Sequence, residues 1–195
     1  MNARQTCPWA LQSTLEEHYH DQEWGVPLYD DARLFEFLLL EGLQAGLSWR
    51  TILQKRDAYR RALDGFDAEK IARYDDKKQA ELLRNPALIR NRLKTQAIVQ
   101  NARAYLDLRE KVDSFNDYLW HFTDGEVIQN HWRVPEQVPS ETAVSRQLSH
   151  DLKQHGFKFT GPVICYAFMQ ATGRVNDHLL SCFRYCAVSI QLRSY

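Results

Sequence analysis

The stretch "DDARLFEFLLLEGLQAG", residues 30–46, decides the class of fold. It opens on Asp30, a residue type that caps the first turn of a helix, and then stays apolar on nearly every side of a helical projection. Such a segment predicts a helix that is buried in the middle of a helical protein. Glu41 interrupts the apolar surface, on the same stripe as Leu38 and Ala45.

The position of Glu41 raises a question about chemistry. An unpaired carboxylate inside an apolar helix is costly to bury, unless its pKa shifts. One interpretation is structural: Glu41 pairs with an arginine or caps the following turn. The other is a pocket carboxylate that binds a polar or cationic ligand. The segment alone leaves both open.

Helical patterns continue on both sides and predict an all-α protein. Ser48 is a good cap for a helix over "SWRTILQKRDAYRRAL", and Gly156 marks a helix end. Residues 123–139 form the only long irregular stretch, and no alternating segment is long enough to build a sheet. The other expected helices are "DAEKIARY" (67–74), "DKKQAELLR" (76–84), "KTQAIVQNARAYLDLREK" (94–111), "SFNDYLWHF" (114–122), "SETAVSRQLSHDLKQHG" (140–156), "GPVICYAFMQATG" (161–173) and "NDHLLSCFRY" (176–185).

Composition narrows the class of protein. Hydrophobic residues make up 44% of the 195 residues, which excludes wholesale disorder. Lys+Arg and Asp+Glu balance at 25 each, so contact with nucleic acid must come from a local patch. The N-terminus "MNARQTCPWALQ" lacks the apolar core of a signal peptide, and four cysteines do not suggest a disulfide framework. We therefore expect a cytoplasmic protein whose reduced thiols can bind a metal.

Two pairs of candidate metal ligands stand at opposite ends of the chain. His178 and Cys182 are four residues apart in a predicted helix, so both side chains project from one face. Cys7 and His20 are the corresponding pair near the N-terminus. Two Cys and two His make a closed tetrahedral zinc site of the structural kind. Taken alone, the spacing of His178 and Cys182 is more often a coincidence than a metal site.

A basic hairpin is the third candidate. The stretch "NPALIRNRLKTQA", residues 85–97, predicts a helix that ends near Leu88, a tight basic connection and a second helix from about Lys94. In a helix–hairpin–helix motif, the turn amides and the second helix N-terminus can hold a phosphate, with Arg90, Arg92 and Lys94 adding charge. The alternative is a plain helical hairpin with a solvated loop, and the glycine usual in such hairpins is missing.

The segment "EEHYHDQEWG", residues 16–25, is rich in charge but also carries large aromatics. Most charge-rich runs are solvated surface, and we assign Glu16, Glu17 and His18 to that class. Tyr19 and Trp24 favour a different role for the rest of the segment, because a solvated loop seldom carries large aromatic side chains.

Five stretches, taken together, resemble the 3-methyladenine DNA glycosylase I family. They are "YHDQEWGVP", "LEGLQAGLSW", "LIRNRLKTQAIVQNARAY", "GFKFTGPVICYAFMQATG" and "VNDHLLSC", which occur in order from about Cys7 to Cys182. The resemblance implies a helix–hairpin–helix glycosylase fold acting as a single unit. A helical core would span about 31–140, and a zinc-containing lobe would combine 1–30 with 141–195. One structural zinc would be held by Cys7, His20, His178 and Cys182.

The resemblance also implies roles for pocket residues. Glu41 and Tyr19 would bind the flipped base, with Glu41 as the main catalytic candidate, and Trp49 would stack on the base. Trp9 and Trp24 are further candidates for the pocket wall. Many members of the family carry an aromatic residue near the position that Glu16 occupies here.

The implied reaction is removal of N3-methylated adenine from double-stranded DNA by a monomeric enzyme. The base is flipped and its N-glycosidic bond is hydrolysed, which leaves an abasic site. Leu47 is a candidate wedge for the vacated space, although a core leucine is equally consistent. Asp113 and Asp117 lie where related glycosylases place an aspartate, and we rank Glu41 above them.

Two other kinds of function are compatible with these residues. One is a non-enzymatic protein of the same fold that recognises the lesion without cleaving it. The other is a zinc-dependent hydrolase, which the sequence disfavours because all four expected ligands come from protein and leave no position for water.

Overall fold

The computed structural model describes residues 5–191 and confirms the all-α class. Ten α-helices are accompanied by short 3₁₀ turns and two very short strands within this range. The α-helices are α1 (Thr14–Gln22), α2 (Asp31–Gln44), α3 (Trp49–Ala62), α4 (Ala68–Ala72), α5 (Asp76–Arg84), α6 (Arg92–Arg109), α7 (Phe115–His121), α8 (Ala143–Gln154), α9 (Pro162–Ala171) and α10 (Phe183–Gln191). The 3₁₀ turns are η1 (Pro8–Gln12), η2 (Asp64–Phe66) and η3 (Pro135–Gln137), and the strands are β1 (Ile128–Gln129) and β2 (Val175–Asn176).

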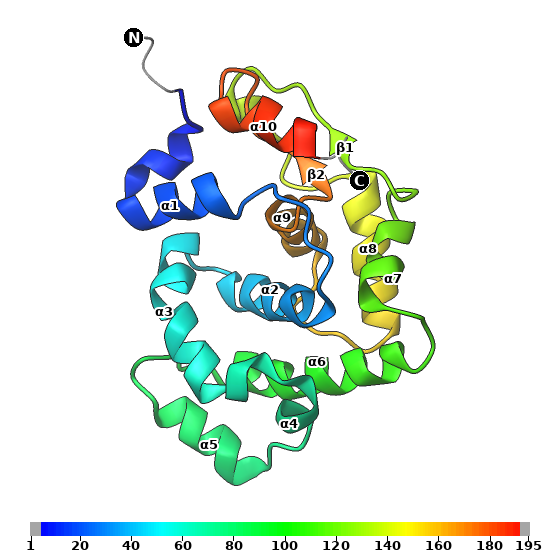
Figure 1. Cartoon of the computed structure of the whole chain (residues 1–195). Coiled ribbons are helices and arrows are strands. Elements are labelled where there is room, and N and C mark those ends of the chain that lie inside the picture. The colour runs from blue at the N-terminus through cyan, green and yellow to red at the C-terminus, as the bar shows by residue number, and fades with distance from the viewer. Residues whose placement is uncertain (1–4, 192–195) are drawn as a thin grey trace.

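Helix α2 is the centre of the molecule, as its sequence predicted (Figure 1). Asp30 caps it by accepting a hydrogen bond from the Arg33 backbone N–H at 2.8 Å. Residues 34–43 are all buried, and helices α3, α6, α7 and α9 pack around them. The enclosure explains why this segment is apolar on nearly every side, and it carries Glu41 into the interior.

Most predicted helix boundaries are confirmed because their capping residues are used as expected. Ser48 accepts from the Thr51 N–H at the start of α3, and Ser114 accepts from the Asp117 N–H at the start of α7. Gly156 follows α8 with a φ of +91°, a left-handed conformation that glycine adopts without strain.

The helix predicted over 176–185 is wrong in its first half. Residues 177–182 form an extended segment and a turn, and α10 begins only at Phe183. The local pattern is overridden by pairing with the stretch 123–139, because Val175 in β2 lies in parallel register with Ile128 in β1. Asn176 adds side-chain bonds to the Gln129 amide and the Tyr185 carbonyl.

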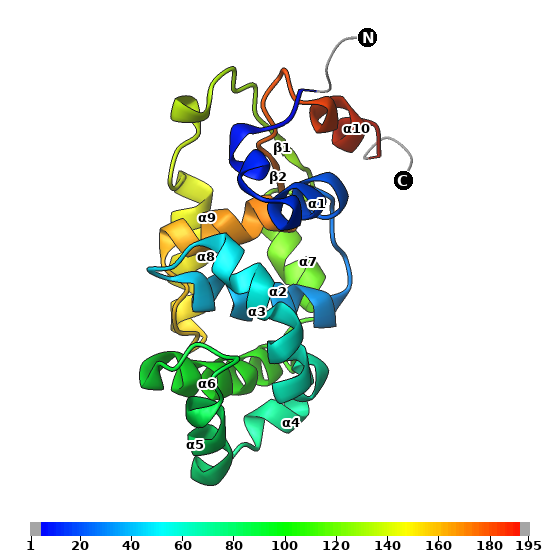
Figure 2. The same cartoon turned by 90° about the vertical axis from the view of Figure 1, so that its left-hand side faces the viewer.

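The N-terminal segment folds against the C-terminal half of the chain (Figures 1 and 2). The Phe183 N–H donates to the Gln5 carbonyl at 3.0 Å, and the Gly25 N–H donates to the Gln170 carbonyl at 3.1 Å. Gly173 permits a close approach: a Cβ there would lie 2.3 Å from the Pro27 nitrogen. These contacts bring η1 and α1 beside the segment that follows β2.

No helix among residues 5–191 is both long enough and apolar enough to cross a bilayer.

Candidate functional site

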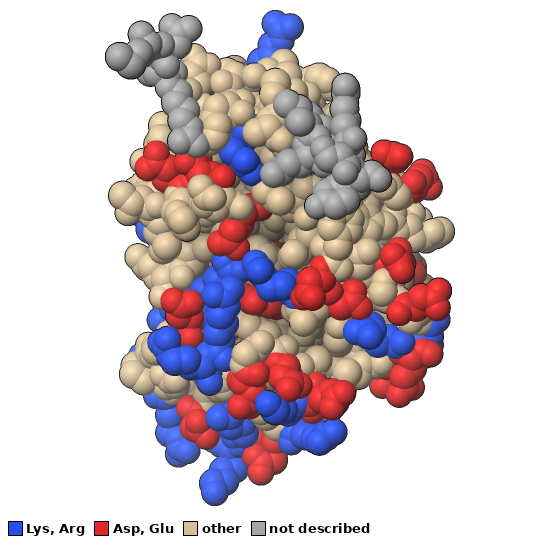
Figure 3. Space-filling model, in the orientation of Figure 1, with Lys and Arg blue, Asp and Glu red and all other residues tan. Residues whose placement is uncertain are grey.

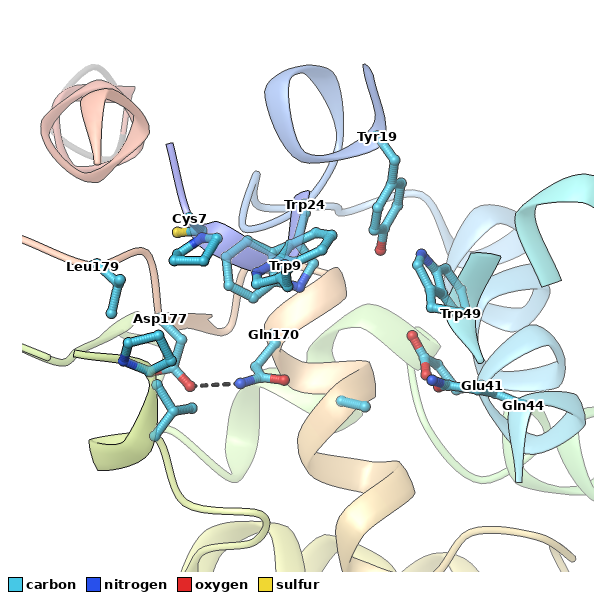
Figure 4. Close-up of a pocket in the computed structure, with 14 residues that line it drawn as sticks. Cys7, Trp9, Tyr19, Trp24, Glu41, Gln44, Trp49, Gln170, Asp177 and Leu179 are labelled. Atoms are coloured by element: carbon cyan, nitrogen blue, oxygen red, sulfur yellow. Dashed lines mark hydrogen bonds between the residues drawn. The ribbon is translucent and has the colours of Figure 1, made fainter. Parts of the chain in front are cut away.

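A cavity of about 280 Å³ lies where the N-terminal segment meets α2, α3 and α9. Pockets for drug-sized ligands run to roughly 300–1,000 Å³, so this one suits a single heterocycle. Figure 4 shows side chains from distant parts of the sequence pointing toward one another around it. Its lining residues are Cys7, Pro8, Trp9, Tyr19, Trp24, Glu41, Gln44, Trp49, Pro135, Val138, Ala167, Gln170, Asp177 and Leu179.

The cavity has aromatic walls on two sides. Trp9 and Trp24 meet edge to face with ring centroids 5.1 Å apart, and Tyr19 and Trp49 lie 5.3 Å apart. The structure thus brings together all five residues that the sequence suggested for a base pocket, since Glu41 lines the same cavity. Aromatic faces attract cations, so these walls favour a flat ligand with positive charge.

Three buried polar atoms in this cavity have no hydrogen-bond partner among the described residues. They are the Tyr19 hydroxyl, Glu41 Oε2 and Trp49 Nε1. No described residue forms an ion pair with Glu41, so the interpretation of this carboxylate as the partner of an arginine has no support. Buried polar groups are nearly always paired in folded proteins, so three unpaired groups around one cavity indicate a ligand that pairs them.

Burial sets the protonation of two of these groups. It raises the pKa of Glu41 to about 8 from an ordinary value of 4.5, because the ionised form loses its hydration. Burial also raises the pKa of Tyr19 well above 10, with the carboxylates of Glu41 and Glu23 adding to the effect. Near neutral pH, the free pocket therefore holds a phenol and a carboxyl group that is mostly uncharged.

A second group of side chains converges beside the pocket. Cys7, His20, His178 and Cys182 are all buried, and their ligand atoms lie within 4.8 Å of one another. His178 Nδ1 is 3.1 Å from His20 Nε2 and 3.7 Å from Cys182 Sγ, while Cys182 Sγ is 3.5 Å from His20 Nε2. Ligand atoms around tetrahedral zinc at about 2.0–2.3 Å would lie about 3.3–3.8 Å apart. The cluster could hold a metal ion.

The remaining ring nitrogens of the two histidines are fixed by neighbours. His178 Nε2 donates to the Trp24 carbonyl at 3.1 Å, and His20 Nδ1 lies 2.8 Å from Asp21 Oδ1. Such outer contacts orient histidine ligands in metal sites. Burial lowers the pKa of His178, which favours the neutral ring that binds metals. The Cys7 thiol and both imidazoles lower the pKa of Cys182 by hydrogen bonding.

The predicted helix–hairpin–helix segment joins α5 to α6. The hairpin is anchored to α3, because the Ile89 N–H donates to the Tyr59 hydroxyl and the Lys55 amine donates to the Ala87 carbonyl. Arg90 and Arg92 are exposed on it. Figure 3 shows basic side chains gathered over α3 to α5, with acidic side chains among them.

Lys94 lies differently from its predicted place on the hairpin surface. It is only 7% exposed, and its amine donates to the carbonyls of Leu43 and Ala45, each at 2.7 Å. The carbonyls at the end of α2 have no partners within the helix, and the amine binds there instead of facing solvent. The sequence predicted that Lys94 contacts phosphate, and this buried position of the amine does not fit that prediction.

Lys94 thereby ties the hairpin to the loop that follows α2, which projects on the same side of the molecule (Figure 2). Leu47 stands in this loop and is 41% exposed, so it is not a core leucine.

Glu16 is buried, contrary to the prediction of a solvated side chain. Its Oε2 accepts from Arg50 Nε at 2.8 Å and from the Ser13 hydroxyl at 2.7 Å. The ion pair links α1 to α3, which carry the Tyr19 and Trp49 walls. Glu17 and His18 are exposed, as expected.

Several lining residues were not anticipated. Gln44, Gln170 and Asp177 contribute polar groups, and Pro135 and Val138 come from the irregular stretch 123–139. The length of that stretch was a usable signal, because long irregular segments in compact domains are often functional. The position of Asp177, directly before His178, was a second one.

The chain is similar to known proteins along most of its length. The family model described as methyladenine glycosylase matches residues 9–185. The DNA-3-methyladenine glycosylase of Haemophilus influenzae is 46% identical over 176 residues, covering 90% of this chain and 95% of the relative.

Solved structures of 3-methyladenine DNA glycosylase I have the same fold as this chain. A crystal structure of 3-methyladenine DNA glycosylase I aligns with a TM-score of 0.90 at 46% identity, covering 92% of this chain and 98% of that one. The Staphylococcus aureus 3-methyladenine DNA glycosylase I, solved to explain its recognition of 3-methyladenine, aligns with a TM-score of 0.89 at 37% identity, covering 93% and 97%. This chain belongs to the methyladenine glycosylase family.

Proposed function

We propose that this protein is a DNA repair glycosylase that removes N3-methylated adenine from double-stranded DNA. It flips the damaged nucleotide into the cavity and hydrolyses the N-glycosidic bond, which leaves an abasic site. The observation that supports this proposal most directly is a set of three unpaired polar groups between aromatic walls. These groups belong to Tyr19, Glu41 and Trp49. The relatives' names give the same substrate.

The chemistry of the lesion explains why such a pocket suffices. Adenine methylated at N3 in DNA carries positive charge, which weakens its bond to the sugar, so no strong general acid is needed. The aromatic faces of Trp9, Trp24 and Trp49 stabilise the cation, and the cation in turn favours the ionised form of Glu41. Both contacts bind neutral adenine more weakly, because it carries no charge. We assign Glu41 as the catalytic residue and Tyr19 and Trp49 as the main base contacts.

We further propose that DNA is held by the exposed hairpin and the loop after α2. Arg90 and Arg92 would bind phosphate, and Leu47 would fill the space left by the flipped nucleotide. The protein would work as a cytoplasmic monomer, with a helical core over about 31–140 and a zinc-containing lobe from 1–30 and 141–195. Light scattering in the presence of duplex DNA would test the one-to-one assembly.

The base-release assay tests the function itself. We expect the protein to release free 3-methyladenine from methylated duplex DNA with multiple turnovers, detected by chromatography of the released bases. Binding to the lesion without release would instead identify a protein that recognises damage and does not cleave it. No binding and no release would overturn the proposal.

Glu41→Gln separates a ligand-binding carboxyl from a structural one. The folded pKa of about 8 exceeds the ordinary value of 4.5, so the folded protein holds a proton that the unfolded chain releases. The contribution of Glu41 to stability is therefore largest below pH 4.5 and is lost as the pH rises to 8. The glutamine side chain of the Glu41→Gln variant does not titrate, so the variant does not lose stability in this way. Between pH 4.5 and about 8, its free energy of unfolding relative to wild type should therefore rise by up to about 1.4 kcal/mol per pH unit.

The same variant should release 3-methyladenine more slowly by about tenfold to a thousandfold, the effect of removing a preorganised electrostatic contact. Denaturant unfolding at several pH values and base release are both measured. A structural ion pair would give the reverse pattern: about 3–5 kcal/mol of lost stability with normal activity per folded molecule.

We propose one structural zinc per chain, held by Cys7, His20, His178 and Cys182. Cys7→Ala should lose the metal and lower the melting temperature by about 10 °C, since about 1 kcal/mol shifts it by roughly 2–4 °C in chains of this size. Cys186→Ala is the matched control, because this cysteine is exposed and lies outside the cluster. Metal analysis below half an equivalent in the purified wild type would contradict the proposal.

Replacing Arg90 and Arg92 with glutamine should weaken DNA binding by a similar factor for every sequence. Each lost phosphate contact should reduce the slope of log K against log salt by about 0.9. Arg146→Gln, an exposed arginine on α8, serves as the control and should leave the slope unchanged. A change in sequence preference at constant salt slope would show that these arginines contact bases.

A further inference from the structure

Asp177 is a buried carboxylate held only by neutral donors among the described residues. It is 2% exposed and lines the cavity directly after β2. Its Oδ1 accepts from Asn130 Nδ2 and Trp132 Nε1, each at 2.7 Å. Its Oδ2 accepts from the Tyr166 hydroxyl at 2.5 Å and from Gln170 Nε2 at 2.7 Å. Four donors, two from the stretch after β1 and two from α9, therefore fix the carboxylate in one orientation.

This fixed carboxylate determines how the Gln170 amide is oriented. A carboxylate can only accept hydrogen bonds, so the group that faces it must be the amide NH₂ and not the amide oxygen. The oxygen, Oε1, then points away from Asp177 toward the Glu41 side of the cavity (Figure 4). No described residue donates to it. The backbone of Gln170 is also held, because its carbonyl accepts from the Gly25 N–H.

Gln170 Oε1 differs from the other polar groups of the cavity. The Tyr19 hydroxyl can rotate to donate or accept, and the Glu41 carboxyl can gain or lose a proton. In the free cavity, therefore, neither group is fixed as a donor or as an acceptor before a ligand binds. The Trp49 indole N–H is always a donor. Gln170 thus offers the cavity an acceptor that cannot turn into a donor, because turning would set its oxygen against the Asp177 carboxylate.

A fixed acceptor distinguishes purines by the group on C6. A 6-amino group has two N–H donors, whereas a 6-oxo group is itself an acceptor and would be repelled. We propose that Gln170, oriented by Asp177, selects 6-amino over 6-oxo methylated purines in this pocket. Gln170 would touch the base, and Asp177 would be a positioning residue. The inference rests on the proposed function and adds the group that reads position 6.

The test uses two free bases of similar shape, 3-methyladenine with an amino group on C6 and 3-methylhypoxanthine with an oxo group there. Calorimetry measures the dissociation constant of each for wild type and for Gln170→Met, which keeps the length of the side chain and removes the amide. We expect wild type to prefer 3-methyladenine by at least about tenfold, as sites built to bind a polar group reject analogues that lack it. Gln170→Met should lose most of that preference. An unchanged preference in this variant would overturn the proposal.

Two further variants separate orientation from mere presence of an amide. Gln44→Met removes another amide from the lining, one that no described residue holds by a hydrogen bond, so its effect should fall equally on the two bases. Asp177→Asn keeps Gln170 but lets its amide turn, and should also reduce the preference. A folded Asp177→Asn variant with full preference would refute the positioning role. If Asp177→Asn fails to fold, Gln170→Met still decides whether Gln170 reads C6.

Base release by wild type keeps this test distinct from that of the proposed function. Release of 3-methyladenine from methylated DNA together with an unchanged preference in Gln170→Met refutes only the role of Gln170. If wild type neither releases 3-methyladenine nor binds it, the proposed function fails and the inference fails with it.

Discussion

The structure depends on the convergence of Cys7, His20, His178 and Cys182 at one buried point. Their neighbours in sequence are walls of the cavity: Pro8 and Trp9 follow Cys7, Tyr19 precedes His20, and Asp177 and Leu179 flank His178. A metal ion bound there would bring the free energy of ligation into folding. The two ends of the described chain, and with them half of the pocket, would be held in place by the same interaction.

The opposite half of the pocket rests on α2, which supplies Glu41 from the most enclosed helix of the fold. Because this carboxyl is desolvated, it is mostly uncharged in the free cavity near neutral pH. A cationic base changes that balance by favouring the ionised form. The walls therefore stabilise a positively charged ligand. Gln170, held by Asp177, presents an amide oxygen that can only accept a hydrogen bond. We relate the first property to methylation and the second to the identity of the purine.

Local signals predicted much of this arrangement, and long-range contacts account for the rest. Asp30, Ser48 and Ser114 cap their helices as their residue types indicate. His178 and Cys182 meet although the helix expected between them is absent, because a turn before α10 also brings them within 3.7 Å. The contacts of Lys94 and Glu16 join residues 49 and 34 positions apart, which no local pattern records.

The proposed function requires that the unpaired groups of the cavity pair with a methylated purine. Adding free 3-methyladenine to ¹⁵N-labelled protein tests it through the indole N–H resonances, assigned with Trp49→Phe and Trp120→Phe. Both indole nitrogens are buried without a partner among residues 5–191, but of the two tryptophans only Trp49 lines the cavity. We expect a saturable shift of the Trp49 resonance and little change at Trp120. No shift at Trp49, or equal shifts at both, would contradict it.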